Sequence, residues 1–378
     1  MNKTSKTSNM WFSPKEPGTK RILIHAINHV GLGHMNRAIS VAQWLKKDMP
    51  GLQVLFLVEG GEDFIAPTGF PWMFVAGQGN ELASYERMTR TVLEIFRPDL
   101  SIHETFLREQ IHYPVRDAGI KQVLMGNVGN ILRTQFRDRL SMVNDMDLAI
   151  ILQQQEEVEP ADQALIARYT GKTIYAGPLV RYKKQIMGGD LRQKLGLTPQ
   201  QKVILLTLAG GGWEASKAIL NNILAAREAI LAAYPEARLI AITGPYYTGE
   251  LPETDDFVCY ASKFEPFFND YLDISSVVVS MAGYSTVNEV AGSGIPAVCV
   301  PTAESGDQVG TGSMSEYAQS FPNMVVSSTQ KEELAQKVIE ALGQQRNLSV
   351  VQEFWSRAEK ASSAIVGEIT ALLNKGDE

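Results

Sequence analysis

Residues 277–308 read VVVSMAGYSTVNEVAGSGIPAVCVPTAESGDQ, and this stretch decides the fold. Its first part, 277–279, is an apolar β-branched run that is typical of a buried parallel strand. A glycine turn follows at Gly283, and a short helix is expected next, with Ser285 or Thr286 as its N-cap. A glycine turn and a hydroxyl-rich helix start therefore follow the carboxyl end of a strand, where open α/β sheets bind ligands.

The same stretch carries one carboxylate, Glu289, on the expected helix. A second strand is expected at 297–300, ended by Pro301. The phosphates of a nucleotide suit the glycine turn, and its ribose hydroxyls suit Glu289. An alternative is purely structural, because Glu289 lies three residues after Thr286 and could complete a capping box.

The stretch resembles the donor-binding signature of GT-B glycosyltransferases, and most closely that of glycosyltransferase family 28, which includes the bacterial enzyme that makes lipid II. The resemblance rests on the ordered spacing of Gly283, Thr286, Glu289, Gly294, Pro296, Pro301, Asp307 and Gln308. It implies that Glu289 holds the ribose and that Asp307 and Gln308 contact the donor sugar. The chain departs from the family at Ala282, where a serine is common.

Shorter likenesses to the same family lie elsewhere in the chain. The loop 28–34 resembles the family's first glycine loop through Gly31, Gly33 and His34. The segment 177–181 resembles a Gly-x-Pro-Val-Arg motif, in which Arg181 would reach the donor diphosphate.

Two further segments have counterparts in the family. The turn Gly210-Gly211-Gly212 lacks the family's serine, so phosphate contacts there would come from backbone N–H groups and the helix dipole. The resemblance also places Phe264 and Glu265 against the base.

Sugar transfer needs a base for the acceptor hydroxyl, and His34 is the leading candidate because imidazole titrates near neutral pH. At the start of a helix it could instead donate a hydrogen bond to phosphate or to the acceptor. Glu104 and His103, at the end of another expected strand, are the alternatives. No metal is expected, since the histidines near the N-terminus lack paired acidic or cysteine ligands.

Composition limits the partners. The 378 residues carry a formal net charge of -7 without a long basic run, which argues against a nucleic-acid partner. No apolar run reaches the roughly 18 residues of a membrane span, and no leader is apparent. We therefore expect a cytoplasmic protein, with at most peripheral membrane contact. Cys259 and Cys299 are expected to be buried thiols.

The expected fold is α/β, of the GT-B type, with two Rossmann-like doubly wound domains that face a central cleft. The first 19 residues are expected to be loose. The expected segments after them are an acceptor-binding domain (20–182), a linker (183–190), a nucleotide-sugar donor domain (191–350) and a C-terminal helix that packs back on the first domain (351–378).

The sequence thus predicts an inverting glycosyltransferase that moves N-acetylglucosamine or a similar sugar from a UDP-sugar co-substrate, with no cofactor required. The acceptor stays open among cell-wall lipid, glycolipid and secondary metabolite. One alternative is an enzyme like the UDP-N-acetylglucosamine 2-epimerases, which share the fold. Another is a non-catalytic subunit that binds nucleotide.

Overall fold

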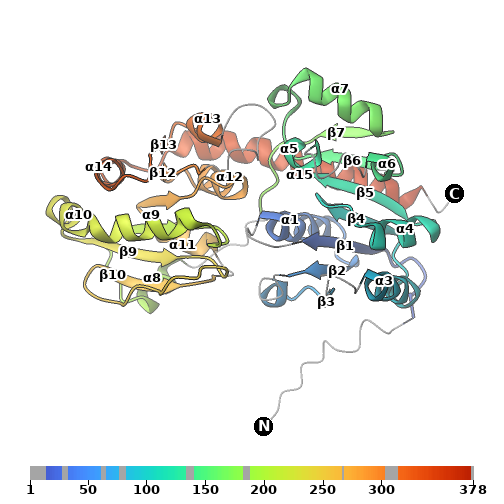
Figure 1. Ribbon diagram of the computed structural model, residues 1–378, viewed down its shortest axis with the longest axis horizontal. Coiled ribbons are helices and arrows are strands. Elements are labelled where there is room, and N and C mark those ends of the chain that lie inside the picture. Colours follow the sequence, from blue (N-terminus) through green and yellow to red (C-terminus); the bar gives the residue numbers. More distant parts are fainter. Residues whose placement is uncertain are drawn as a thin grey trace, which may run out of the picture. The chain divides into compact units, whose positions relative to one another are not determined.

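The chain divides into two units. The first comprises Met1–Asn28, Ala38–Gly177 and Ser362–Glu378, and the second comprises His29–Arg37 and Pro178–Ala361. The computed structural model describes residues 14–27, 33–60, 65–75, 82–132, 140–181, 188–265, 268–302 and 314–375. Each unit contains one parallel sheet with helices packed on it (Figure 1).

The first unit holds a seven-stranded sheet, in the order β3-β2-β1-β4-β5-β6-β7. Its strands are β1 (Arg21–Ile27), β2 (Gln53–Glu59), β3 (Trp72–Phe74), β4 (Leu100–Glu104), β5 (Lys121–Gly126), β6 (Leu148–Ile151) and β7 (Thr173–Tyr175). Its helices are α1 (Gly33–Asp48), α3 (Leu82–Phe96), α4 (Glu109–Asp117), α5 (Val128–Leu132), α6 (Leu140–Val143) and α7 (Pro160–Tyr169), with 3-10 turns η2 (Ala66–Thr68) and η4 (Gln155–Glu157).

The second unit holds a six-stranded sheet, in the order β10-β9-β8-β11-β12-β13. Its strands are β8 (Lys202–Thr207), β9 (Ala237–Ile242), β10 (Val258–Ser262), β11 (Val277–Ser280), β12 (Ala297–Cys299) and β13 (Met324–Val326). Its helices are α8 (Gly188–Lys194), α9 (Glu214–Ala225), α10 (Arg227–Ala233), α11 (Phe268–Ile274), α12 (Tyr284–Ser293), α13 (Met314–Gln319), α14 (Lys331–Leu342) and α15 (Leu348–Asn374).

Both sheets are doubly wound, as the sequence predicts. In each unit the first strand lies between the second and the fourth, so the winding direction reverses beside that first strand. The reversal lies between β1 and β4 in the first unit and between β8 and β11 in the second. Ligands of such sheets bind beyond the strand ends at this switch point.

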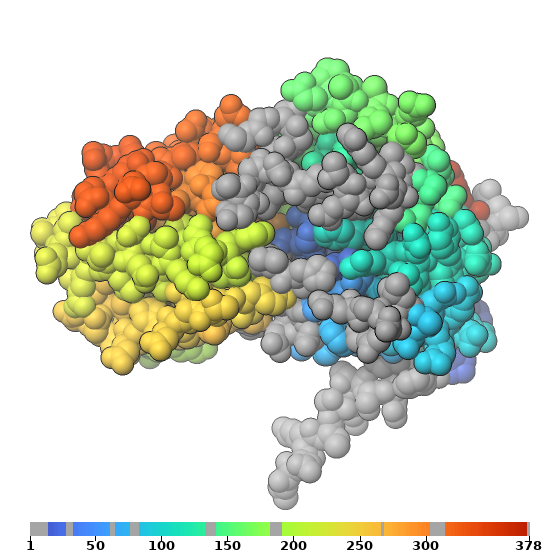
Figure 2. Space-filling model, viewed as in Figure 1, coloured from blue at the N-terminus to red at the C-terminus, as the bar shows by residue number. Residues whose placement is uncertain are grey.

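The second sheet is covered on both faces by apolar side chains. On one face, α9, α10 and α14 pack against residues such as Leu206 and Val279. On the other, α11, α12, α13 and the start of α15 pack against residues such as Leu205 and Val278. Figure 2 shows the surfaces of α9 and α14 side by side. This burial is the main source of the unit's stability, because apolar area removed from water contributes roughly 25 cal/mol per Å².

Two element boundaries differ from expectation. The apolar pattern at 213–234 predicts one long helix, but the structure breaks it at Ala226 into α9 and α10. The strand expected at 99–102 continues through His103 and Glu104, so neither residue lies in a loop beyond it. Both are fully buried, and pairing with β5 over five residues explains the longer strand.

The last helix, α15, contributes to both units, because its residues up to Ala361 belong to the second and those from Ser362 to the first. In the first unit, Lys20 and Lys121 donate hydrogen bonds to the carbonyl oxygens of Leu373 and Leu372, at 3.0 and 2.8 Å. Lysine ammonium groups thereby satisfy carbonyls that a helix end leaves without partners. Among the helices that the structure describes, none is long and apolar enough to cross a membrane.

Candidate functional site

The switch point of the second unit brings together the two turns that the sequence singles out. Thr207 at the end of β8 pairs with Ser280 at the end of β11, and each strand runs directly into one turn. Each turn holds an alanine with a left-handed backbone, Ala209 at φ 52° and Ala282 at φ 54°. A non-glycine residue there costs on the order of 1–3 kcal/mol, so the surrounding structure holds both turns in place.

The glycines at 210–212 are explained in part by packing. Gly211 has φ +77°, and a Cβ atom built on it would lie 2.1 Å from the carbonyl oxygen of Thr243. Gly244 on the facing loop is equally crowded, with its own added Cβ 2.2 Å from the carbonyl carbon of Gly210. The N–H of Gly211 donates to the carbonyl oxygen of Leu208 at 2.8 Å and is thus engaged within the turn. A role in phosphate binding stays a prediction for Gly210 and Gly212.

Gly283 has no such structural explanation. It is the N-cap of α12, with φ −67°, a value that any residue adopts. A Cβ atom built on it would meet nothing within 4 Å among the described residues. Neither the backbone conformation nor packing against the described residues requires a glycine here.

The expected cap of α12 is wrong. The helix begins at Tyr284, so Ser285 and Thr286 lie inside its first turn, and no side chain of the described chain caps it. The capping box of Thr286 with Glu289 is therefore excluded in this structure. The Ser285 hydroxyl oxygen is buried, and no described residue hydrogen-bonds to it.

Glu289 and Arg181 form an ion pair within the second unit. The Arg181 Nε donates to Glu289 Oε1 at 2.7 Å, and the two side chains are only 16% and 7% exposed. The pair borders a small pocket of about 20 Å³. The pocket is lined by Val180, Arg181, Asn269, Leu272, Asp273, Asn288, Glu289, Gly292, Ser293, Phe354 and Trp355.

The segment expected to meet the base is held by its own neighbours. The Ser262 hydroxyl donates to the Phe264 carbonyl at 3.0 Å and accepts from the Phe264 N–H at 3.1 Å. The Tyr260 hydroxyl donates to the Glu265 carboxylate. The Phe264 N–H would have to leave the Ser262 hydroxyl before it could bind a ligand.

His34 is the second residue of α1, in the part of that helix that belongs to the second unit. A nitrogen of the Arg37 guanidinium lies 2.9 Å from His34 Nδ1. Because a guanidinium can only donate, Nδ1 is the acceptor and neutral His34 carries its proton on Nε2. Nearby, a Cβ atom built on Gly33 would lie 3.6 Å from Ser285 Oγ, so the starts of α1 and α12 are close. This tautomer suits a donor, the second of the two roles that the sequence leaves open.

The other two candidates for the base, Glu104 and His103, lie in the first unit. Glu104 is fully buried at the end of β4 and accepts a hydrogen bond from the Thr105 hydroxyl at 3.0 Å. Burial, with the nearby His25 and His112, lowers the pKa of His103 to about 3. His103 is thus neutral near pH 7 and bonds to Gln122 at 2.9 Å, which is a structural arrangement.

A polar network in the first unit is not predicted from the sequence. The Glu59 carboxylate accepts hydrogen bonds from His25, Tyr85 and Arg108, the last through two nitrogens at 3.1 and 2.9 Å. Burial alone would raise the pKa of Glu59, but hydrogen bonds and charge from these donors lower it to about 2. The only signal in the sequence is a single polar residue, His25, inside the apolar run of β1.

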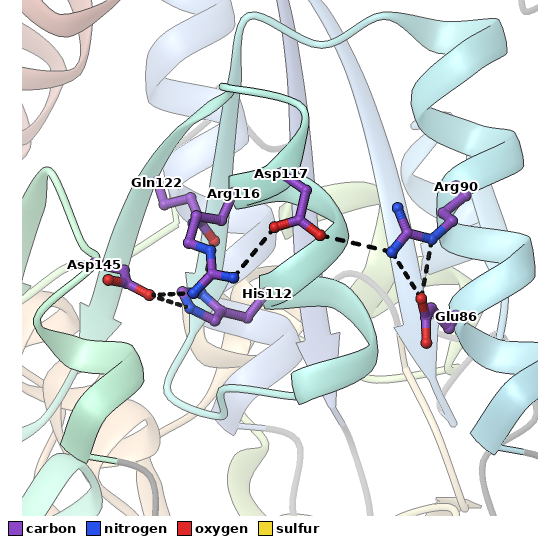
Figure 3. A network of polar contacts seen from close by, with 7 residues as sticks. All are labelled: Glu86, Arg90, His112, Arg116, Asp117, Gln122 and Asp145. Carbon is purple, nitrogen blue, oxygen red and sulfur yellow. Dashed lines mark hydrogen bonds and ion pairs between the residues drawn. The ribbon is translucent and has the colours of Figure 1, made fainter.

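A second polar group in the first unit reaches the surface through His112. This buried imidazole lies 3.0 Å from both Gln122 Oε1 and Asp145 Oδ2. Figure 3 follows the chain of contacts from Asp145 to Arg116 and on through the exposed residues Asp117, Arg90 and Glu86. Asp145 is thus an ion-pair partner within the first unit.

Three predicted site residues lie outside the described residues: Gly31, Asp307 and Gln308. Of the remaining ones, the second unit contains Gly33, His34, Arg181, Gly210, Gly211, Gly212, Phe264, Gly283, Ser285, Thr286 and Glu289. Glu104 belongs to the first unit.

Comparison with known proteins finds a family match in the second unit. Residues 206–347 match the glycosyltransferase family 28 C-terminal domain, a range that runs from the end of β8 to just before α15. No curated protein matches the chain significantly.

Solved glycosyltransferases share the fold. The glycotransferase of kitacinnamycin is 14% identical, with a TM-score of 0.60 over 94% of this chain and 100% of that one. UGT89C1 of Arabidopsis thaliana, complexed with UDP, is 14% identical, with a TM-score of 0.60 over 92% and 99%. UGT71G1 of Medicago truncatula, complexed with UDP-glucose, is 10% identical, with a TM-score of 0.60 over 94% and 99%. The chain therefore has the GT-B fold, and residues 206–347 of its second unit match the family 28 C-terminal domain.

Proposed function

We propose that the protein is an inverting glycosyltransferase that transfers a sugar from a UDP-sugar, such as UDP-N-acetylglucosamine, to a small-molecule or lipid-linked acceptor. The observation that carries this proposal is Gly283, a glycine that the fold does not require, at the switch point of a family 28 domain. Structures of the same fold are complexed with UDP and UDP-glucose, which supports a nucleotide-sugar donor.

In the proposed reaction an acceptor oxygen or nitrogen forms a bond to the anomeric carbon of the sugar. The bond between that carbon and the β-phosphate oxygen breaks, and UDP leaves with the electron pair. The acceptor's proton passes to a base. Charge that develops on the leaving phosphate needs donors already in place, which is the main contribution that such a site makes.

The residues of the second unit supply these donors. The N–H groups at the start of α12 and the helix dipole suit the phosphates, and Arg181 adds a positive charge. Glu289 suits the ribose hydroxyls, because a carboxylate accepts two hydrogen bonds. The hydroxyls of Ser285 and Thr286 lie in the first turn of the same helix.

We propose that His34 donates a hydrogen bond from Nε2 to the leaving phosphate or to the acceptor. The contact with Arg37 favours this role over that of a base, since it keeps the proton on Nε2. His34→Gln retains a donor, whereas His34→Ala does not. We expect the glutamine variant to keep most of the activity and the alanine variant to lose at least about tenfold, because one hydrogen bond to a charged group is worth about 1.5–3 kcal/mol. An equal loss of activity in the two variants would instead support His34 as the base.

The donor class is tested by a thermal-shift screen against UDP, dTDP, GDP, UDP-glucose and UDP-N-acetylglucosamine. Ligands that bind only the folded protein raise its Tm by mass action. We expect a shift selective for UDP that grows with one sugar and vanishes in Glu289→Ala. A shift in Tm with dTDP or GDP instead would show that the donor carries that nucleotide and not UDP.

Incubation with UDP-N-acetylglucosamine alone separates transfer from the alternatives. Formation of UDP-N-acetylmannosamine would indicate an epimerase. Binding of UDP with neither transfer nor hydrolysis of any donor would indicate a non-catalytic subunit.

A further inference from the structure

His112, on α4 of the first unit, has an acceptor at each of its two ring nitrogens. Its Nδ1 lies 3.0 Å from the side-chain oxygen of Gln122, and its Nε2 lies 3.0 Å from Oδ2 of Asp145 (Figure 3). Because an amide oxygen and an ionised carboxylate can only accept hydrogen bonds, both ring nitrogens must donate. In this arrangement the fully buried ring of His112 therefore carries two protons and a positive charge.

The amide of Gln122 is held in its orientation by a second histidine. His103 Nε2 lies 2.9 Å from the same oxygen, so neutral His103 donates from Nε2 and leaves its Nδ1 bare. If the amide turned over, the proton of His103 would have to move to Nδ1. No described residue hydrogen-bonds to that buried atom, and a buried N–H without an acceptor is less favourable than a bare acceptor. His103 thus keeps the Gln122 oxygen directed at His112.

Asp145, on the other side of His112, is free to change partners. Its side chain is 33% exposed and also accepts a hydrogen bond from Arg116 at 3.3 Å, so Arg116 and water can replace His112. A neutral His112 can donate from only one nitrogen, and the fixed oxygen of Gln122 requires that nitrogen to be Nδ1. The bare Nε2 would then face a carboxylate. Two acceptors that face each other repel, so the contact with Asp145 is the one that breaks.

The surroundings of His112 leave Asp145 as the group that balances its charge. The other charged and titratable groups around the ring are Arg116 and Tyr113 of α4, His103 of β4, and Arg90 of α3, which pairs with Glu86 and Asp117. Arg116 is nearly half exposed, so water screens its repulsion. Burial lowers the pKa of His103 to about 3, so His103 adds no charge above pH 5.

We propose that His112 is a pH-sensitive link in the first unit, which holds Asp145 while its ring is charged and releases Asp145 when the ring is neutral. On release, the proton on Nε2 passes to water and the proton on Nδ1 stays with Gln122. The link joins α4 to the turn between α6 and β6. Asp147 at the end of this turn stays in place, because it exchanges two hydrogen bonds with the backbone of Gln122, at 2.7 and 2.9 Å.

The first experiment is nitrogen NMR of the full chain with ¹⁵N-labelled histidine, recorded from pH 5 to pH 9. The chain has five histidines, and His112→Gln identifies the signals of His112. We expect both nitrogens of His112 to be protonated at low pH, and Nε2 alone to lose its proton as the pH rises. Loss of the proton from Nδ1 instead would show that the Gln122 amide turns, and would overturn the inference. One proton at pH 5, or two at pH 9, would overturn it as well.

The second experiment measures the release itself by hydrogen exchange in Asp145→Asn, corrected for intrinsic rates. The reporter is the N–H of Met146, which donates to the Val143 carbonyl at 3.2 Å within the turn. Below the pH at which His112 loses its proton, this N–H should exchange about tenfold faster in the variant, because a hydrogen bond between charged groups is worth about 1.5–3 kcal/mol. Above that pH the two proteins should exchange alike.

Asp117→Asn is the matched control. Asp117 is an exposed aspartate that pairs with Arg116 and Arg90 in the same group of contacts but does not contact His112. Its substitution should leave both the exchange of Met146 and the signals of His112 unchanged. Equal exchange of Met146 in Asp145→Asn and in the unsubstituted protein below the transition would show that His112 does not hold the turn, and would overturn the link.

Discussion

The two units share one strand order but differ in what their sheets bury. In the second unit both faces are covered by apolar side chains, and the residues expected to bind ligand gather at the strand ends. In the first unit three fully buried histidines, His25, His103 and His112, lie in a row with ring centroids 6.2 and 6.4 Å apart. The same topology thus concentrates polarity at one edge in the second unit and spreads it through the interior of the first.

In the second unit, the residues that stabilise the fold are therefore separate from those expected to bind ligand. In the first unit, the polar residues are part of the buried interior that stabilises the fold. A substitution at the strand ends of the second unit can remove function while the core stays intact. A substitution in the interior network of the first unit leaves other buried polar groups without partners, which costs about 1–3 kcal/mol for each group. Four predictions test the contrast, from the largest effect to the smallest.

The largest effect is expected for Glu59→Ala in the first unit. Its removal leaves His25 and Tyr85 buried without their acceptor and Arg108 without its anion. We expect the free energy of unfolding to fall by about 3–5 kcal/mol, as for other broken buried pairs. Urea denaturation followed by circular dichroism measures it.

Glu86→Ala is the control for Glu59→Ala. Glu86 pairs with Arg90 on the surface of α3, with both side chains nearly half exposed. Such a pair contributes about 0.5 kcal/mol. Similar losses in the two variants would show that the buried network of the first unit adds nothing to stability.

A smaller but still large effect is expected for Gly211→Ala in the second unit. The left-handed backbone and the Thr243 carbonyl 2.1 Å from the added Cβ should destabilise the fold by about 3 kcal/mol. The methyl group of Gly283→Ala meets no described residue within 4 Å, and the substitution should cost about 1 kcal/mol or less, the difference between glycine and alanine at an N-cap. Thermal melting compares the two variants.

The two substitutions should rank in the opposite order in their effect on UDP affinity, with the larger effect at Gly283. We expect Gly283→Ala to weaken UDP binding by at least about tenfold, since the methyl group occupies space at the helix start where phosphate approaches. Full affinity of Gly283→Ala for UDP would place the phosphates elsewhere.

Acid should destabilise the first unit before the second. His103 has its pKa lowered from 6.5 to about 3, so the unfolded chain binds more protons between these pH values. The stability that neutral His103 contributes is present above pH 6.5 and is lost as the pH falls toward 3. At pH 5 the loss is about 2 kcal/mol. Glu59, with its pKa lowered from 4.5 to about 2, adds a further loss below pH 4.5.

Hydrogen exchange at pH 7 and pH 5, corrected for the intrinsic rate, locates this loss. Protection should fall in β1, β4 and β5 and persist in β8 and β11. His103→Gln keeps a group able to reach Gln122 but does not titrate, so it should remove most of the pH dependence between 7 and 5. Equal loss of protection in both sheets would contradict the assignment.

The smallest effect is expected at a strained turn of the second unit. Ala209→Gly relieves the left-handed backbone at φ 52°. The added flexibility of glycine in the unfolded chain offsets part of the gain, so we expect a net stabilisation of about 0.5 kcal/mol. The control Ala218→Gly, inside α9, should instead destabilise by about 1 kcal/mol. Calorimetric melting of both variants resolves the opposite signs.

The sequence predicts the doubly wound fold because apolar strand runs such as 21–27 and 277–279 are short-range signals that end in glycine turns. Short motifs also predict that the glycine turns and Glu289 lie in the second unit, whereas Gly33, His34 and Arg181, expected in the domain 20–182, belong to the second unit as well. It does not predict that Arg181 meets Glu289, because 108 positions separate them in the chain. The sequence does not predict the network around Glu59 either, because the partners of Glu59 come from β1, α3 and the residue before α4.

The wrong cap of α12 has a similar cause. Ser285 and Thr286 have the side chains that favour an N-cap, but the left-handed turn at Ala282 starts the helix earlier, at Tyr284. The break at Ala226 is invisible for the opposite reason, because alanine has the highest helix propensity and marks no boundary. Tertiary structure decides both positions.

The division of α15 between the units bears on how the protein is made. The first unit draws its sheet from the early part of the chain and its last helical residues from 362 onward. Lys20 and Lys121 can make their hydrogen bonds to the carbonyl oxygens of Leu373 and Leu372 only after about 350 and 250 further residues have been synthesised. The unit that begins first therefore lacks part of its structure until residues 362–375 have been made, and a chain stopped before Leu372 would lack both carbonyl partners.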